Sequence, residues 1–342
     1  MTGAAYSGTT EAAGSKRMRS SRWRNALRSP EVSSFAILAV IVVLFNVGNH
    51  DFLSARNISN ILAFLPELGI IALGMTLLMT AGEFDLGVGA VFALAPVTVM
   101  LLVQQWGWEF WPALLVGLAA SIVIGLFNGI VITKIGISSF LVTLSMLLIV
   151  RGAALYITQG FPLKSVDLQG PLVTLLAGSF AIGPFTIYAS LFWFVGLTFL
   201  SIYLLDYSKL GNWISAIGSN RSAAIARGVP ADAVKVGLFI TTSVLAGLAG
   251  MISALRISNA SPVAGTNYEL EVIAMVVVGG TALTGGRGTI LGTVAGIFLL
   301  RAIRNGIVLV GVPGLAFNIF VGAIILGMLV MHVGLQKTAV RG

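Results

Sequence analysis

Long apolar stretches separated by short polar segments fill the chain from residue 33 onward. A membrane-spanning helix needs roughly 20 consecutive apolar residues, and about ten stretches approach that length. The eighth is short and glycine-rich, so we expect it to be broken or re-entrant. The pattern predicts an all-α polytopic membrane protein whose spans lie near residues 33–49, 58–81, 87–104, 111–133, 138–158, 186–205, 235–256, 270–285, 289–310 and 315–334.

The positions of the charges orient this arrangement. Of the 20 lysines and arginines, 14 fall on the side of the N-terminus, three (Arg56, Lys164 and Arg256) fall opposite, and three lie within spans. Positive residues gather on the cytoplasmic side, which predicts cytoplasmic termini. We therefore predict a disordered basic tail over 1–33, a transmembrane domain over 34–334 with a cytoplasmic loop at 206–234, and a cytoplasmic tail over 335–342.

Composition excludes several classes of function. Only 9% of residues are charged and 57% are hydrophobic, which does not fit a soluble domain. The chain has no cysteine and two histidines, and no hydrolase or metal-site motif is present, so we assign no catalytic residue and no metal. The net charge of +8 reports orientation, and we expect membrane lipid but no nucleic acid as a partner.

A glycine-rich run, Gly279 to Gly288, resembles a phosphate-binding loop but has no Gly-Lys pair. We therefore expect this chain to bind no ATP. Small residues instead allow helices to pack closely in lipid, either within one protomer or across a dimer. The predicted packing positions are Gly279, Gly280, Gly288, Gly292 and Gly296.

The hydrophilic stretch Ser208 to Lys235 contains a short alanine-rich helix, predicted over Arg221 to Val229. Asn220 is placed to cap its start, Gly228 to end it and Pro230 to prevent its continuation. A short basic helix held at the membrane surface has little core to bury. We expect it to be gripped by a partner.

Ionisable residues inside spans are costly and normally face a cavity or a partner. Arg151 on the fifth span is predicted to face a polar cavity or an acid, as a structural ion pair or as a pathway residue. Glu83 and Asp85 occupy a turn that either is solvated at the cytoplasmic surface or has a functional role, in which it lines the pathway or braces a neighbouring helix. Arg301 and Arg304 anchor at the outer surface or pair with acids, for which the candidates are Glu269 and Glu271.

Two further features concern topology. The block Asn128 to Val131 repeats as Asn305 to Val308, five spans later, which indicates either an inverted repeat or chance. The outer loop 159–185 is predicted to contain a short interfacial helix over Leu172 to Ile182.

Five blocks together resemble the membrane permeases of ribose-type ABC importers, the second class of carbohydrate-uptake systems, over about residues 35–334. The family has Gly-Gly-Ile-Asp-Leu-Ser-Val-Gly where this chain has Gly82 to Gly89, and Gly-x-Asn-x-x-Ala-Ala-x-x-x-Gly-Ile where it has Gly218 to Val229. The other blocks are Asn128-Gly129, Phe140 to Pro162 and Glu269 to Gly306. The chain departs from the family at Glu83 (usually Gly), Gly87 (usually Ser) and Glu271 (more commonly Asp).

The resemblance implies a machine in which two permease subunits, alike or homologous, form a path for a monosaccharide or polyol. A cytoplasmic ATPase would bind MgATP, an extracytoplasmic protein would deliver the sugar, and the chain itself would bind no cofactor. It would lie in the bacterial inner membrane. The implied ATPase-coupling residues are Asn220, Ser222, Ala223, Ala224, Arg227 and Gly228, and the implied pathway or structural residues are Asp85, Asn128, Arg151 and Asn305. The alternatives are an ATP-independent secondary transporter or channel for a small polar solute, and a lipid-modifying membrane enzyme.

Overall fold

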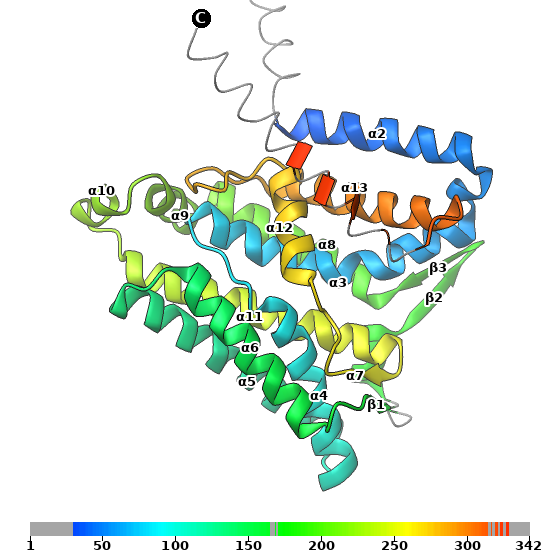
Figure 1. Ribbon diagram of the computed structural model, residues 1–342, viewed down its shortest axis with the longest axis horizontal. Coiled ribbons are helices and arrows are strands. Elements are labelled where there is room, and N and C mark those ends of the chain that lie inside the picture. Colours follow the sequence, from blue (N-terminus) through cyan, green and yellow to red (C-terminus); the bar gives the residue numbers. More distant parts are fainter. Residues whose placement is uncertain are drawn as a thin grey trace, which may run out of the picture.

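The computed structural model describes residues 30–164, 168, 170–313, 316, 319, 320, 322, 323, 326 and 327. Figure 1 shows a bundle of helices with two small strand pairs. The α-helices are α2 (Pro30–Gly48), α3 (Ala55–Thr80), α4 (Val88–Trp106), α5 (Phe110–Ile130), α6 (Ser139–Ile157), α7 (Pro171–Ala177), α8 (Ala189–Ile202), α9 (Lys209–Ser219), α10 (Arg221–Ala226), α11 (Ala231–Arg256), α12 (Tyr268–Val278) and α13 (Ile290–Leu309). A 3-10 helix, η1 (His50–Leu53), and two π-helical turns, η2 (Val131–Ile135) and η3 (Tyr203–Tyr207), lie between them.

Seven of these helices are long and apolar enough to cross a membrane, namely α3, α4, α5, α6, α8, α11 and α13 with their π-helical extensions. They coincide with predicted spans two to seven and nine, which confirms an all-α polytopic membrane protein. Helix α2 covers the first predicted span and begins at Pro30, inside the predicted tail. The rest of that tail, the tail 335–342 and most of the tenth predicted span lie outside the described residues.

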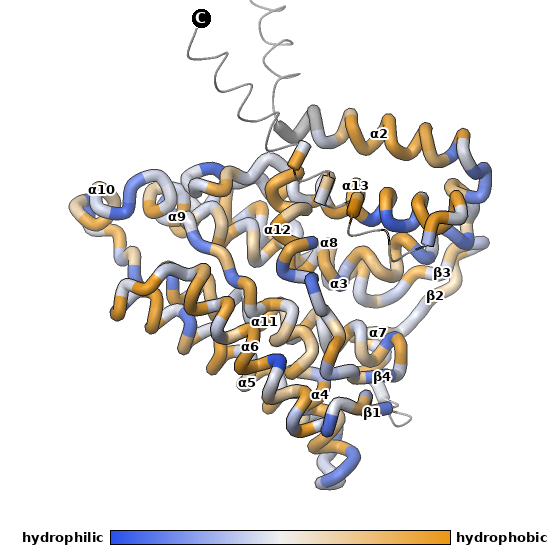
Figure 2. Tube along the Cα trace, viewed as in Figure 1, coloured by the Kyte–Doolittle hydropathy of each residue, from blue (hydrophilic) through white to orange (hydrophobic). Residues whose placement is uncertain are grey.

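Helix α3 is the core of the bundle. Nearly every residue from Leu65 to Thr80 has less than 4% of its surface exposed, and the helix packs against α8, α11, α12 and α13. Close packing rests on glycines, because Gly69 lies against Phe194 and Gly74 against Thr242. The outer helices differ, since Val123 of α5 and Leu148 of α6 are more than 60% exposed. Figure 2 shows that α2 is also mostly apolar, and Val43 and Val47 on this helix are more than 60% exposed.

The bundle has two ends, which we name by their elements. The α10 end carries α9, α10, the C-terminus of α3 and the N-termini of α6 and α11. The hairpin end carries two antiparallel strand pairs, β1 (Leu163–Lys164) with β4 (Asn259–Ala260) and β2 (Ser179–Ile182) with β3 (Phe185–Tyr188). The interfacial helix predicted over 172–182 is therefore too long. It ends at Ala177, and the apolar residues after Gly178 pair as strands.

Helices α4 and α12 begin inside the bundle rather than at its ends (Figure 1). Helix α12 has 11 residues and a length of about 16 Å, about half of the roughly 30 Å hydrocarbon core. Its C-terminus lies at the α10 end, where the Gly286 amide of the following loop donates to the Thr80 carbonyl (2.8 Å). The segment 257–267 before it is not helical. Of the predicted eighth span 270–285, only residues 270–278 are helical, in line with the expectation that this glycine-rich stretch is broken or re-entrant.

Candidate functional sites

Helix α10 is the projecting element at the α10 end (Figure 1). Asn220 has extended backbone angles, and its side-chain oxygen accepts from the Ala223 amide (3.0 Å). Gly228 adopts a left-handed conformation (φ +82°) that stops the helix. The predicted capped helix is confirmed, although it ends at Ala226 rather than Val229. Ala224 is buried against the bundle, whereas the remaining predicted coupling residues are exposed: Asn220, Ser222, Ala223, Arg227 and Gly228.

Helix α9 was missed by treating 206–234 as a polar loop. Its buried residues Gly211, Ile214 and Ile217 recur every three residues, and this amphipathic spacing is the signal that could have identified it. The first residues assigned to the loop, 206 and 207, complete η3, and α11 begins at Ala231 rather than 235. The segment is therefore largely helical.

Glycines join α9 to the rest of the α10 end. Gly218 packs against the Thr80 carbonyl and the Gly286 amide, and Gly285 packs against Gly82. The run Gly279 to Gly288 is thus a packing surface. Its predicted ridge packs inside the protomer: Gly288 meets Thr80, Gly292 meets the Gly279 backbone and Gly296 meets the Met275 carbonyl.

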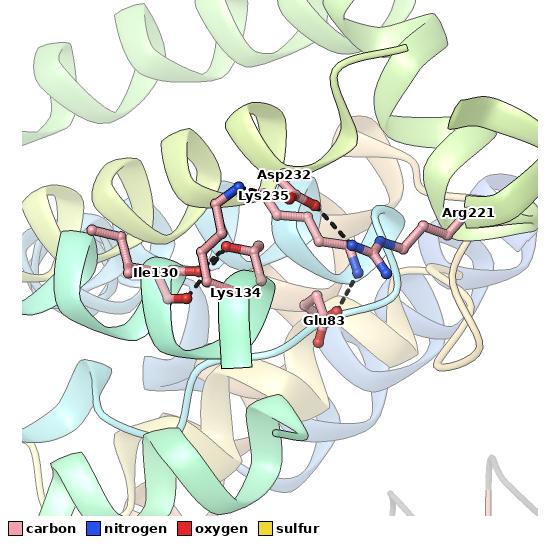
Figure 3. A network of polar contacts seen from close by, with 8 residues as sticks. Glu83, Ile130, Lys134, Arg221, Asp232 and Lys235 are labelled. Carbon is pink, nitrogen blue, oxygen red and sulfur yellow. Dashed lines mark hydrogen bonds and ion pairs between the residues drawn. The ribbon is translucent and has the colours of Figure 1, made fainter. Parts of the chain in front are cut away.

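An ion-pair network links α10 to three other elements (Figure 3). Asp232, in the first turn of α11, accepts from Arg221 (2.7 Å) and from Lys134 of η2 (3.2 Å). Lys235 of α11 pairs with Glu83 in the segment 81–87, and both side chains are nearly buried. A force on α10 would therefore reach α11, η2 and the segment that joins α3 to α4.

The turn around Asp85 is not solvated, and that alternative is wrong. Asp85 is fully buried, its Oδ1 accepts from the Gly87 amide (2.7 Å), and the adjacent Leu86 amide donates to the Thr143 hydroxyl (3.1 Å). The carboxylate also faces Asn128 of α5 and Ser243 of α11, both buried. The segment 81–87 is thus braced against three helices.

The main contacts of Arg151 are neither a polar cavity nor an acid, the two surroundings that the sequence predicted. Its guanidinium donates to three backbone carbonyls, those of Pro262 (2.7 Å), Ala264 (2.7 Å) and Gly89 (2.9 Å). Glu269 lies near enough to act on it electrostatically but is not its hydrogen-bond acceptor. Arg151 therefore fastens α6 to the first turn of α4 and to the segment 257–267.

Two ion pairs lie around α12: the pair of Arg256 with Glu67 is buried, whereas Arg304 in the pair with Glu271 is 40% exposed. Arg304 of α13 donates to both carboxylate oxygens of Glu271 (3.1 Å each), which confirms one predicted pairing. Arg256 was placed on the outer side, at the end of the predicted span 235–256. It does end α11, and it pairs with Glu67 of α3 and stacks on Phe64 at 3.9 Å. Glu67 was missed, although a single acid within an apolar span was a visible signal.

Other polar residues also lie near these ion pairs. Arg301 and Glu269 are also buried. Asn305, near the hairpin end of α13, donates to Asn57 of α3 (2.7 Å). Asn128 instead lies near the α10 end of α5, so the two similar blocks occupy opposite ends of the bundle. Among the described residues, no group of three or more His, Cys, Asp or Glu side chains could hold a metal ion.

A bundle with interrupted helices and a capped helix projecting at one end is the architecture of a membrane transporter. Residues 57–329 match the family described as branched-chain amino acid transport system / permease component, and the chain belongs to that family. The family and the seven apolar helices make it a multi-pass protein of the inner membrane. No solved structure matches the chain.

Three curated relatives align over most of their length. The ribose import permease protein RbsC of Escherichia coli K12 is 33% identical over 88% of this chain and 92% of its own. The xylose/arabinose import permease protein XylH of Sulfolobus acidocaldarius is 31% identical over 90% and 86%. The L-arabinose ABC transporter permease protein AraH of Azospirillum brasilense is 30% identical over 86% of each chain.

Proposed function

We propose that this chain is the permease subunit of a binding-protein-dependent ABC importer for a monosaccharide or related polyol. The observation that carries the proposal is the near full-length similarity to permeases whose names specify ribose, xylose/arabinose and L-arabinose. The exposed, capped α10 supports the proposal, because a permease subunit that hydrolyses no ATP needs an element to which a separate ATPase subunit can bind.

In this proposal the chain has ten spans with both termini and the α10 end in the cytoplasm. The ATPase grips α10 there and holds MgATP, and the chain binds no cofactor. A second permease subunit, identical or homologous, completes the sugar pathway. The extracytoplasmic sugar-binding protein docks at the hairpin end.

The contacts of α10 suggest how ATPase closure would move the pathway. Helix α10 packs on α9, whose Gly218 packs against the end of α3 and against the run 279–288 that follows α12. Arg221 of α10 pairs with Asp232 of α11, and Lys235 of α11 in turn pairs with Glu83. Both routes end at interrupted helices, which are the elements able to change shape without unfolding a whole span. ATP would shift the population between two arrangements of these segments.

The test uses the full complex with its cognate ATPase and binding protein in proteoliposomes. Ala223→Arg places a bulky cation on the exposed face of α10 while Ala224 keeps its buried contact. A residue central to an interface contributes more than about 1–2 kcal/mol, so we expect ATPase co-purification and ATP-driven uptake of ribose, xylose or arabinose to fall about tenfold. Asn212→Arg, on the exposed face of α9, is the matched control. Full uptake and ATPase binding by Ala223→Arg would refute the coupling assignment.

One observation favours the ATP-independent alternative. The buried Asp85, facing Asn128 and Ser243, is the kind of intramembrane acid that ion-coupled carriers use. That alternative predicts sugar uptake by this chain alone in liposomes under a proton or sodium gradient. The importer proposal predicts no such uptake without the ATPase.

A further inference from the structure

The non-helical segment 257–267 starts at the hairpin end with β4, and its second half, from Pro262 onward, lies deep within the membrane. It is held there by Arg151, and the rise of α6 over residues 139–151 is about 18 Å, more than half of the hydrocarbon core. The Gly265 carbonyl packs against Gly89, in the first turn of α4. Helix α12 begins at Tyr268 and, after 11 residues, reaches the α10 end. The start of α12 is therefore near the middle of the membrane.

One side of this segment is open. Thr266, Asn267 and Leu270 are exposed, whereas Gly265 and Glu269 between them are buried. Irregular backbone with polar side chains does not face lipid at this depth, because its hydrogen-bonding groups would be unsatisfied. This surface must therefore meet water or another protein.

The second interrupted crossing lies on the same side of the molecule. The segment 81–87 leads into the first turn of α4, where Gly89 packs against the Gly265 carbonyl of the segment before α12. Phe84 of the former meets the exposed Phe140 of α6 edge to face, with ring centroids 6.3 Å apart. Next to Arg151, Gly152 faces open space. The open side thus continues along α6 toward the α10 end.

We propose that residues 266–270 form part of the wall of the aqueous sugar pathway, with Thr266 and Asn267 as sugar-contacting residues and Arg151 as the residue that positions them. This inference rests on the proposed sugar-import function. The Asn267 amide can both donate and accept hydrogen bonds, and the Thr266 hydroxyl, which donates to the Val263 carbonyl (2.6 Å), can still accept one. Such groups suit a neutral ligand covered with hydroxyl groups. Asn267 is well fixed for this role, because it adopts a left-handed conformation (φ +67°) and begins α12.

Cysteine labelling tests the wall, because the chain has no cysteine of its own. Thr266→Cys and Asn267→Cys are made in the full complex in open membranes, with and without ATP, and exposed to a charged, membrane-impermeant methanethiosulfonate. Val123→Cys, 63% exposed midway along α5, is the lipid-facing control. A thiol in water ionises and reacts, whereas one in lipid does not. We expect both test sites to react at least about tenfold faster than the control in one nucleotide state, and labelling to block uptake.

The outcomes separate this inference from the proposed function. If the complex takes up sugar under ATP but both test cysteines react as slowly as Val123→Cys in every state, the pathway does not run past residues 266–270. If the wild-type complex shows no ATP-driven uptake, the proposed function fails whatever the labelling result.

A second pair of variants tests the sugar contact itself. Asn267→Gly keeps the left-handed backbone and removes the amide, whereas Asn267→Ala also strains the backbone. We expect Asn267→Gly to assemble normally and to raise the KM for sugar about fivefold, the loss of roughly one hydrogen bond. An unchanged KM in Asn267→Gly would overturn the contact.

Discussion

The molecule contains two groups of ion pairs that differ in their surroundings. At the α10 end, Asp232 is 35% exposed and its partners Arg221 and Lys134 are 46% and 67% exposed. Around α12, Glu67 and Arg256 are 3% and 8% exposed. Exposed pairs contribute little to stability, whereas a buried charge that loses its partner is strongly unfavourable. The surface group can therefore be rearranged as a partner docks, but the buried group fixes how the helices pack.

The largest effect is expected where a buried pair is broken. Arg256→Ala leaves the Glu67 carboxylate without its partner in the core of α3 and removes the stacking on Phe64. We expect the complex to lose about 3–5 kcal/mol of stability, measured as a lower thermal unfolding midpoint in detergent. The double variant Glu67→Gln with Arg256→Met should recover much of the loss. A single variant as stable as wild type would show that the pair is not buried.

The next effect concerns Arg151, whose three acceptors are backbone carbonyls. Arg151→Ala removes the guanidinium donor from these three carbonyls, and we expect a loss of about 2–4 kcal/mol together with reduced uptake. Arg151→Lys keeps the charge but not the planar fork, so it should be intermediate. If lysine matched arginine in both assays, charge alone would account for the role of residue 151.

A smaller effect is expected at the joint between α9 and α3. Gly218→Ala would push a methyl group into the Thr80 carbonyl, so we expect a loss of about 1–3 kcal/mol. If α9 transmits motion, the variant should also lower the number of sugars transported per ATP hydrolysed. Gly237→Ala, where the space is open, is the control and should behave as wild type. Equal behaviour of the two variants would count against the joint.

The smallest effect belongs to the surface network. Asp232→Asn should change stability by no more than about 1 kcal/mol, because all three side chains are partly solvated. The change should also shrink further as salt is added. A loss that is large and independent of salt would mean that the α10 end is as tightly fixed as the start of α12.

Sequence reasoning succeeded where the cause of a structure is local. Asn220 and Gly228 specify the ends of α10 through their own backbone preferences, and apolar length located seven spans. It failed where partners are distant in the chain. The acceptors of Arg151 lie 111 and 113 residues later and 62 residues earlier, and they are carbonyls, which no residue type marks.

Two other failures have the same physical basis. The residues after Gly178 are apolar enough for a helix, and only their pairing with Phe185–Tyr188 makes them a strand. The turn at Asp85 has the polarity of a solvated loop, and its burial depends on α5, α6 and α11 closing around it. Tertiary packing, rather than local preference, decides both.

The pair between Glu67 and Arg256 also bears on how the protein is made. Its two residues are 189 positions apart, so α3 leaves the ribosome long before α11 exists. Until α11 is made, Glu67 has no cation to pair with. Placing its charged carboxylate in the membrane interior then costs about 2.5–3.5 kcal/mol. Helix α3 must therefore stay sheltered by the insertion machinery until α11 is inserted. The innermost helix of the finished protein is thus among the first synthesised and among the last to reach its final surroundings.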